Sequence, residues 1–127
     1  MKKIASKNTG CEMLLRKELW KAGLRYRLHR KDLPGKPDLI FSRYKVVVFV
    51  DGDFWHGFRW EQRKVKIISN RDYWIQKIEG NMARDKINNS KLRKLDFTVL
   101  RFWEHDILKN PKLCADKIEK RLLANSK

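Results

Sequence analysis

Cysteine and acidic side chains are both scarce in this chain. Only two cysteines, Cys11 and Cys114, occur among 127 residues, and they lie far apart in the sequence. Two distant cysteines provide neither a disulfide framework nor a cysteine-rich metal site, so a reducing, cytoplasmic compartment is expected. Aspartate and glutamate together number 15, against 31 lysines and arginines, which leaves a net charge of +16.

Long apolar runs are also absent from the sequence. No stretch approaches the roughly 20 apolar residues that cross a bilayer, and no signal peptide opens the chain. No long predicted helix pairs a basic face with a continuous apolar one, which makes a membrane surface a poor match. We therefore expect no membrane partner.

The excess of positive charge predicts a polyanionic partner, because a compact protein with this charge repels itself. The alternative is that the charge serves only to keep the protein soluble. The length is that of a single domain, residues 1–127, with a modest core. Nucleic acid is therefore the expected partner of one small domain.

Hydrophobic periodicity and capping signals predict alternating helices and strands. Thr9 and Glu12 form a capping box that opens a helix, and Gly23 ends that helix. Trp20 and Trp103 are expected in the core. The later elements are expected as strands over residues 24–28, 38–41 and 46–50, a basic loop over 57–71, a helix over 71–95, a buried strand over 97–102 and a final helix capped by Asn110-Pro111. This αβββαβα order predicts an α/β fold with a mixed β-sheet flanked by helices.

The most informative segment surrounds the predicted strand Val46–Val50. Asp38 precedes the strand, and Asp51-Gly52-Asp53-Phe54-Trp55-His56 follows it directly, with twelve residues between Asp38 and Asp51. Two carboxylates and an imidazole at the edges of adjacent strands suit a divalent-metal phosphodiesterase, since the metal offsets phosphate charge and lowers the pKa of the attacking water. With its basic surroundings, this segment indicates a nuclease.

In order and on the expected elements, these motifs resemble those of the very-short-patch-repair (Vsr-type) endonucleases, a branch of the PD-(D/E)xK nuclease superfamily. The resemblance covers nearly the whole chain and rests on Thr9-x-x-Glu12, Leu33–Asp38, Val48–His56, Tyr73–Asn81, Arg84-Asp85 and Val99–Glu104. It implies a restriction-endonuclease-like fold with an αβββαβ core, and metal-dependent cleavage of DNA.

The resemblance implies that Asp38, Val50 and Asp51 hold one or two Mg²⁺ ions. Asp38 is the expected direct ligand, the backbone carbonyl of Val50 a second ligand, and Asp51 binds the metal or holds a metal-bound water. Magnesium usually takes one or two protein carboxylates and completes its shell with water and phosphate. The alternative for Asp38 is an aspartate that caps a turn after Pro37, and part of the family has a histidine at the Asp51 position.

The resemblance also gives catalytic roles to His56, Glu12 and Asp85. His56 is expected near the scissile phosphate, where an imidazole takes a proton from water or gives one to the leaving oxygen. Glu12 would hold a metal-bound water, and Asp85 would orient His56 or an outer-shell water. Each residue has a structural alternative: a histidine satisfied by local hydrogen bonds, a capping-box glutamate and an exposed helix acid.

Aromatic residues that match Phe54, Trp55 and Trp74 wedge between base pairs next to the mismatch in this family. Such a wedge selects steps already weakened by mispairing, because unstacking costs a few kcal/mol. The alternative for Trp74 is core packing on the long helix. Contacts to phosphates or base edges are further expected from Asn81, Arg59, Arg63, Lys64 and Lys66.

One departure from the wider superfamily concerns the segment Asp51-x-Asp53. Many superfamily nucleases carry a lysine there, and this chain has none. His56 or a basic residue of 59–71 would then have to supply the missing positive charge.

A second departure concerns the structural zinc of the better-known members. Its ligand positions correspond here to Asp53, Phe58, Trp60 and His105. Two aromatic rings cannot ligate zinc, so a closed four-ligand site is not available. We expect no structural zinc, with Phe58 and Trp60 packing in its place.

Three functions are compatible with these observations. The leading hypothesis is a metal-dependent nickase that cuts one strand of double-stranded DNA at or beside a T:G mismatch. One alternative is the catalytic domain of a homing, mobile-element or defence endonuclease without mismatch specificity, and another is a non-catalytic DNA-binding module. The presence of Glu12, Asp38, Asp51 and His56 together argues against an inactive module. A monomer on DNA fits the cutting of one strand, and a bacterial protein of this kind would lie with the nucleoid.

Overall fold

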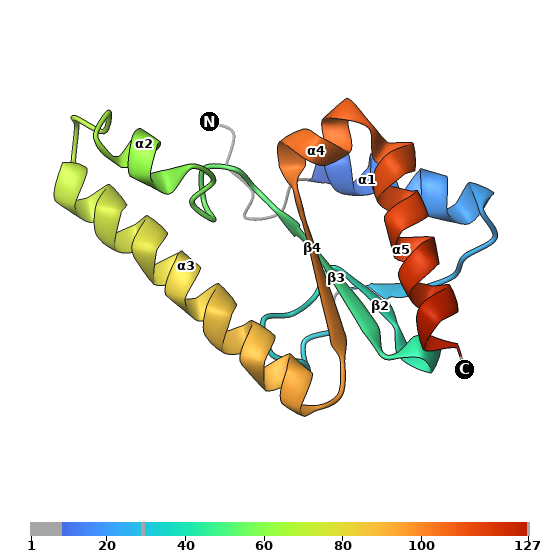
Figure 1. Cartoon of the computed structure of the whole chain (residues 1–127). Helices are drawn as coiled ribbons and strands as arrows, with labels where there is room; N and C mark the ends of the chain where they lie inside the picture. Colours follow the sequence, from blue (N-terminus) through green and yellow to red (C-terminus); the bar gives the residue numbers. More distant parts are fainter. Residues whose placement is uncertain (1–8, 29, 127) are drawn as a thin grey trace.

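A four-stranded mixed β-sheet forms the centre of the computed structural model, which describes residues 9–28 and 30–126 (Figure 1). The strands, in their order across the sheet, are β1 (Arg27–Leu28), β2 (Leu39–Phe41), β3 (Val46–Asp51) and β4 (Thr98–Trp103). Neighbours among the first three strands are antiparallel, whereas β3 and β4 run parallel. A short 3-10 turn, η1 (Ser42–Tyr44), joins β2 to β3. The α/β class and the mixed sheet predicted from the sequence are confirmed.

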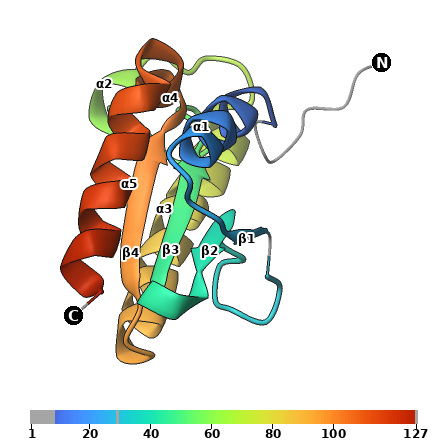
Figure 2. The ribbon, with the colours of Figure 1, turned by 90° about the vertical axis from the view of Figure 1, so that its right-hand side faces the viewer.

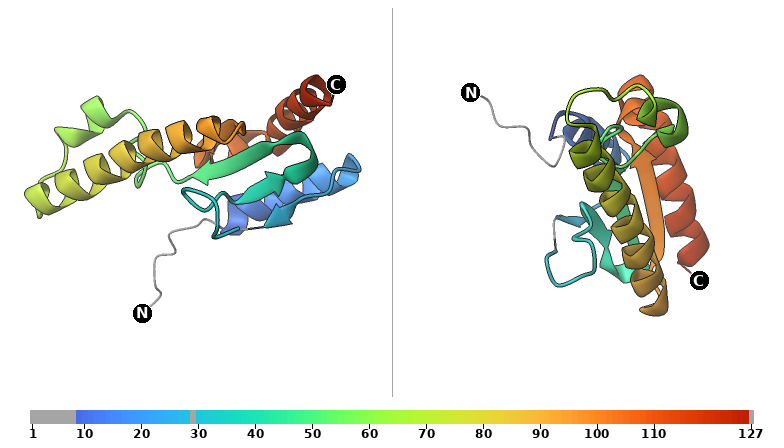
Figure 3. Two further views of the ribbon diagram at one scale, coloured as in Figure 1. Left: turned by 90° about the horizontal axis from the view of Figure 1, so that it is seen from below. Right: turned by 90° about the vertical axis from the view of Figure 1, so that its left-hand side faces the viewer.

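Helices cover both faces of this sheet (Figures 2 and 3). The helices are α1 (Thr9–Lys21), α2 (Trp60–Lys64), α3 (Arg71–Lys94), α4 (Glu104–Lys109) and α5 (Pro111–Asn125). The helix α3 crosses one face, while α1, α4 and α5 pack on the other. A parallel strand pair needs a long crossover connection, and α2 and α3 provide it between β3 and β4. Within the described ranges, no helix has both the length and the apolar character to cross a membrane.

The side chains of β3 alternate between two cores. Val46, Val48 and Val50 pack against α1, α4 and α5, whereas Val47 and Phe49 belong to the smaller core beneath α3. This alternation follows from the pleat of a strand, which turns successive side chains to opposite faces. Because helices cover both faces, all six residues of β3 are buried, as expected for a strand that reads as a continuous apolar run. The last residue of β3 follows Phe49 by two positions and therefore shares the α3 face.

The ends of the helices follow their sequence signals. Gly23 adopts a φ of 82° just after α1, the left-handed conformation that glycine accepts at low cost. At the start of α5 the Asn110 side chain accepts a hydrogen bond from the Leu113 backbone N–H at 3.0 Å, and Pro111 occupies the first helical position. The helix α1 begins at Thr9, and the expected cap by that side chain lies outside the described residues.

Several expectations from the sequence were wrong in detail. The strand expected over 24–28 shrinks to the two residues of β1, and the expected loop over 57–71 contains α2. The helix α4 was not predicted at all, since helices of five or six residues give no full amphipathic pattern. The strand β4 is half-buried rather than buried. Trp20 is not in the core: it is 53% exposed, and the Arg25 guanidinium lies 3.3 Å from its ring centroid.

Candidate active site

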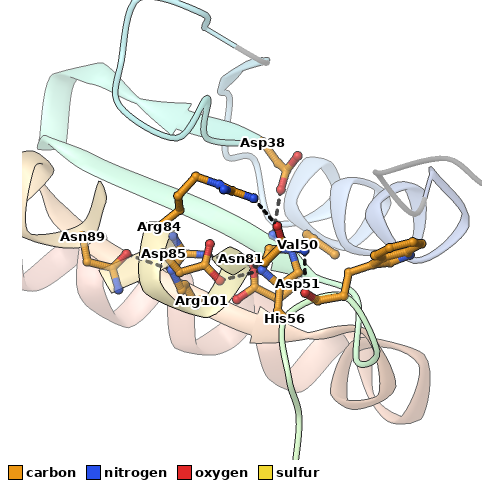
Figure 4. A network of polar contacts seen from close by, with 10 residues as sticks. Asp38, Val50, Asp51, His56, Asn81, Arg84, Asp85, Asn89 and Arg101 are labelled. Carbon is orange, nitrogen blue, oxygen red and sulfur yellow. Dashed lines mark hydrogen bonds and ion pairs between the residues drawn. The ribbon is translucent and has the colours of Figure 1, made fainter. Parts of the chain in front are cut away.

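Asp38 lies immediately before β2 and reaches across to β3. Its carboxylate is buried, and Oδ2 accepts a hydrogen bond from the Val50 backbone N–H at 2.7 Å. The Asp38 backbone N–H donates to the Val48 carbonyl at 3.0 Å, which extends the pairing of β2 with β3. Asp38 and Val50, two of the three residues that the resemblance gives as metal-binding, are thus in direct contact through the Val50 N–H at one end of the sheet (Figure 4).

A second group of ligand-type atoms lies on the α3 side of β3. His56 Nδ1 is 2.6 Å from Asp85 Oδ2 and 3.8 Å from Asp51 Oδ1. Asp51 ends β3, His56 lies in the following loop, and Asp85 comes from the middle of α3. One ligand atom from each residue lies within 4.8 Å of the other two. The structure therefore brings three of the expected site residues together, and the predicted contact between Asp85 and His56 is present.

Arg101 completes this cluster and was not anticipated from the sequence. Its Nη1 lies 2.9 Å from Asp51 Oδ1 and 3.7 Å from Asp85 Oδ1. The residue belongs to β4, where the parallel register pairs it with Phe49, two positions before Asp51. The cation beside Asp51 therefore comes from β4, not from His56 alone or the 59–71 segment. The one signal in the sequence is a charged residue inside the apolar run Val99–Phe102.

Burial and mutual charge shift the pKa values of two members of the cluster. Burial raises the pKa of the Asp51 carboxyl, although Arg101 and His56 act in the opposite direction. For His56, burial alone would lower the pKa. The hydrogen bond to Asp85 and the negative charges of Asp51 and Asp85 outweigh that effect, and the pKa lies above its ordinary value. His56 therefore holds its proton more tightly than a free histidine does.

Glu12 lies near the same end of the molecule, in the first turn of α1. Its side chain is buried, and Oε2 lies 3.4 Å from Nη1 of Arg16. The pKa of the neighbouring Cys11 thiol is raised to about 12. Burial is the largest cause, and the negative charges of Glu104, Glu12, Asp38 and Asp53 add to it. The charges of Glu12 and Asp38 therefore both contribute to the raised pKa of one buried thiol.

The loop that carries the aromatic residues is held against α3. Its backbone forms tight turns, with the His56 N–H donating to the Gly52 carbonyl at 3.1 Å. Asn81 Nδ2 donates to the Trp55 carbonyl at 2.9 Å, which fixes the loop from the helix side. Gly57 has a φ of 78°, a left-handed conformation that favours glycine, and a Cβ there would collide with the Met82 side chain. Asn81, expected to contact DNA, thus positions this loop.

Phe54, Trp55 and Trp74 form one aromatic cluster. The ring centroids of Phe54 and Trp55 are 5.6 Å apart, those of Phe54 and Trp74 5.4 Å, and those of Trp55 and Trp74 5.7 Å. Tyr73 adds an exposed ring, 5.0 Å from that of Trp74. Trp74 lies outside both hydrophobic cores, so its alternative role in core packing is wrong. Partly exposed rings in mutual contact form a continuous surface beside the acidic cluster.

An open cavity of about 380 Å³ is lined by Trp55, one ring of this cluster, and by His56 and Asp85. Part of its polar lining comes from one face of α3 and includes Lys77, Asn81 and Arg84. Figure 4 shows Asn81 and Arg84 beside the Asp51–His56–Asp85 cluster. Sequence reasoning missed Lys77, Arg84 and Asn88 as site residues. Their signal is a helical stripe, since residues 77, 81, 84, 85 and 88 recur every three or four positions.

The basic side chains expected to meet DNA lie on and around α2. Arg59 and Lys66 are exposed, whereas Arg63 is half-buried. Lys64 is half-buried too, and its Nζ lies 2.9 Å from Glu79 Oε2, so a neighbouring carboxylate already offsets its charge. Arg59 and Lys66 are therefore more accessible to solvent than Arg63 and Lys64.

Three of the four positions that correspond to a family zinc site, Asp53, Phe58 and His105, meet in space. His105 Nδ1 lies 2.9 Å from Asp53 Oδ1, and the Phe58 ring packs 4.3 Å from the His105 ring and 5.2 Å from that of Trp103. Trp60 is buried, and its indole N–H donates to Glu79 at 2.9 Å. Aromatic packing and histidine–carboxylate contacts occupy this region, since His105 Nε2 also lies 3.3 Å from Asp106 Oδ1.

Comparison with known proteins agrees with this geometry. A family model described as "DNA mismatch endonuclease Vsr" matches residues 1–62. Type II nicking enzyme V.NmeDIP of Neisseria meningitidis serogroup C is 50% identical over 113 residues, covering 89% of this chain and 76% of the relative. Type II nicking enzyme V.HpaIIP of Haemophilus parainfluenzae is 49% identical over 122 residues, covering 94% and 86%. DNA mismatch endonuclease Vsr of Escherichia coli (strain K12) is 34% identical over 122 residues, covering 96% and 78%. The chain belongs to the Vsr family of DNA mismatch endonucleases.

Proposed function

We propose that this protein is a Mg²⁺-dependent DNA endonuclease that nicks one strand at or beside a T:G mismatch. The single observation that carries the proposal is the open cavity whose lining holds the His56–Asp85 pair together with Trp55, a member of the aromatic cluster. The names of the relatives, a mismatch endonuclease and nicking enzymes, support the same activity. A protein of this kind is expected to act in the cytoplasm, as a monomer on double-stranded DNA.

The residues around Asp38 fit a magnesium ion. The buried Asp38 carboxylate accepts a hydrogen bond from the Val50 N–H. Its second oxygen, the Val50 carbonyl and the Asp51 carboxylate are oxygen ligands, the type that Mg²⁺ prefers. Bound there, the ion would offset phosphate charge and lower the pKa of the attacking water. Asp38 is therefore assigned as the principal ligand, with Val50 and Asp51 in support.

His56 is assigned to proton transfer at the scissile phosphate. Its Nδ1 is engaged by Asp85 at 2.6 Å, so Nε2 is the ring nitrogen available to a substrate oxygen or water. Asp85 fixes the orientation of the ring, in the same way that a buried carboxylate positions a histidine in other hydrolases. Lys77 and Arg84, on the cavity wall, are assigned to the negatively charged DNA backbone.

A nicking assay on three substrates tests the proposed function. Supercoiled plasmid, fully paired duplex and T:G-mispaired duplex are incubated with Mg²⁺ or with EDTA. Magnesium-dependent nicking of one strand of the mispaired duplex is the expected result. Equal cutting of both duplexes would place the protein with general, homing or defence nucleases, and tight binding without cutting under any divalent metal would leave a DNA-binding module.

Replacing Trp55 by alanine is expected to reduce the preference for mispaired over paired duplex about tenfold or more, since aromatic stacking contributes roughly 1–3 kcal/mol per base. General affinity for DNA should fall less, because phosphate contacts lie elsewhere. The measurement is the ratio of nicking rates on the two duplexes. Trp20→Ala, at an exposed tryptophan that stacks with Arg25, is the matched control. Equal losses on both duplexes would contradict the wedge.

Purified protein is expected to contain less than about 0.1 zinc per chain, because two of the four family ligand positions carry rings that cannot coordinate the metal. Elemental analysis after growth in zinc-supplemented medium measures this content. Dialysis against EDTA should leave the melting temperature unchanged, in contrast to proteins whose fold depends on zinc. One tightly bound zinc per chain would overturn the expectation.

A further inference from the structure

A side-chain contact holds the start of the loop of residues 52–58, which carries Phe54 and Trp55. Asp53 Oδ1 lies 2.9 Å from Nδ1 of His105, the second residue of α4. Because a carboxylate oxygen accepts hydrogen bonds, the imidazole N–H is the donor. The His105 backbone N–H also donates to this oxygen, at 3.5 Å. The contact thus ties the loop to a helix fifty-two positions further along the chain.

Aromatic rings cover this contact. The Phe58 ring lies 4.3 Å from the His105 ring and 5.2 Å from that of Trp103. The Phe58 backbone N–H also donates to the Asp53 carbonyl at 2.9 Å, which closes the turn on itself. The Asp53 and His105 side chains are 25% and 39% exposed, so the contact is partly shielded from water, and a hydrogen bond is stronger where water is excluded.

The same region does not fit the zinc of the better-known family members. Asp53 and His105 can each offer a ligand, but the Phe58 ring has none, and the Trp60 indole N–H donates to Glu79 at 2.9 Å. Of the four corresponding positions, two therefore carry a ligand atom, whereas a structural zinc takes four. The loop has to be held in another way on the α4 side.

The opposite side of the loop is held independently, by α3. Asn81 Nδ2 donates to the Trp55 carbonyl at 2.9 Å, and Asp85 contacts the His56 ring at 2.6 Å. Breaking the contact with α4 would therefore loosen the first turn of the loop and leave the His56–Asp85 pair in place. The two sides can be tested separately.

We infer that the Asp53–His105 contact, covered by Phe58, is a positioning latch that takes the place of the family's zinc. It fixes the first turn of the loop, so that the aromatic residues beside it are already ordered when they meet a mismatch. The inference rests on the proposed function for the role in mismatch recognition, whereas the latch itself is a property of the protein without DNA.

Hydrogen exchange of the protein without DNA, followed by mass spectrometry, tests the latch. Asp53→Ala and His105→Ala should each accelerate exchange in residues 52–58 about two- to tenfold, as expected for the loss of one hydrogen bond, and leave exchange in β3 unchanged. Asp106→Ala is the matched control. Its carboxylate lies 3.3 Å from Nε2 of the same histidine, but both residues belong to α4, so exchange in the loop should stay as in wild type.

Two further variants at His105 separate the hydrogen bond from the packing. His105→Phe keeps a ring against Phe58 and removes the donor, so it should follow His105→Ala, and it carries the test if the alanine variant does not fold. His105→Asn keeps a side-chain N–H near the position of Nδ1 and should restore slow exchange in the loop. Addition of EDTA to wild type should change nothing.

Nicking kinetics test what the latch does for recognition. In Asp53→Ala and His105→Phe, KM for T:G-mispaired duplex should rise about two- to tenfold, because the aromatic residues are less well ordered before binding. The kcat should change less than about twofold, since Asp85 still holds His56. His105→Asn should restore most of the wild-type KM. A merely structural defect would instead lower the rates on paired and mispaired duplex alike.

The outcomes distinguish this inference from the proposed function. Unchanged loop exchange in both Asp53→Ala and His105→Phe would overturn the latch, whatever the enzyme does to DNA. Faster loop exchange in wild type on addition of EDTA would also overturn it, because a bound metal would then hold the loop. Faster exchange with an unchanged KM, in a protein that prefers mispaired DNA, would overturn the role in recognition. Faster exchange in the variants of a wild type without that preference would support the latch and reject the proposed function.

Discussion

Asp38→Asn is expected to reduce the rate of nicking about a thousandfold or more, because a metal site contributes several kcal/mol to transition-state stabilisation and each 1.4 kcal/mol is about a factor of ten. The fold should remain, since the amide oxygen of asparagine can still accept the hydrogen bond from the Val50 N–H, now 2.7 Å long. Charge is lost while shape is kept, so the variant isolates the electrostatic role of the carboxylate.

The measurement is a single-turnover nicking rate on T:G-mispaired duplex, accompanied by a melting temperature. Asp116→Asn, which removes an exposed carboxylate on α5 that pairs with Lys112, is the matched control and should retain the wild-type rate. The competing role for Asp38, a cap for the turn after Pro37, leads to the opposite pattern. In that case asparagine, which also caps turns, would leave both the melting temperature and the nicking rate near those of wild type.

Elements with a strong local signal were predictable from the sequence. The strand β3 was visible because five successive apolar residues, Val46–Val50, suit a strand covered on both faces. The helix α3 was expected from about Arg71 onwards and begins there. Asn110 was expected to cap α5, and it does so through its side chain. In each case a few neighbouring residues determine the structure, so the signal does not depend on the rest of the fold.

The features that sequence reasoning missed depend on long-range contacts. Arg101 and Asp51 are fifty positions apart, and their contact exists only because the parallel register of β3 and β4 sets them on the same face. Trp20 was expected in the core because tryptophan is usually well buried, but its position on α1 lies outward, where Arg25 covers part of the ring. No local pattern carries either fact.

The residues of the candidate site also fall into two groups, those predictable from the sequence and those found only in the structure. Among the residues named by the resemblance, His56 and Asp85 are in contact and Asp38 accepts from the Val50 N–H, while their roles in catalysis stay predictions. The cavity wall formed by Lys77 and Arg84 came only with the structure. A helical stripe of polar residues is also what a solvent-exposed face looks like, and the sequence alone gives no reason to prefer a binding wall over such a face.

His56→Ala is the second variant with a large expected effect, a fall in nicking rate of about a hundredfold to ten-thousandfold, as is usual when a group that transfers a proton is removed. DNA affinity should change little, because the imidazole is mostly buried against Asp85 and offers little surface for contact with DNA. Rates under saturating enzyme and a separate binding titration measure the two quantities. Imidazole added to the buffer should restore part of the rate, since the open cavity gives a small ring access to the vacated position.

A double-mutant cycle with Asp85 decides whether that carboxylate acts through His56. Asp85→Asn alone should slow nicking, because it weakens the 2.6 Å contact that orients the ring. In the His56→Ala background the same change should have little further effect, since residues that act as one unit are strongly non-additive. If the two losses multiply instead, Asp85 has a role that does not pass through the histidine. It would then act on a metal-bound water or on the substrate itself.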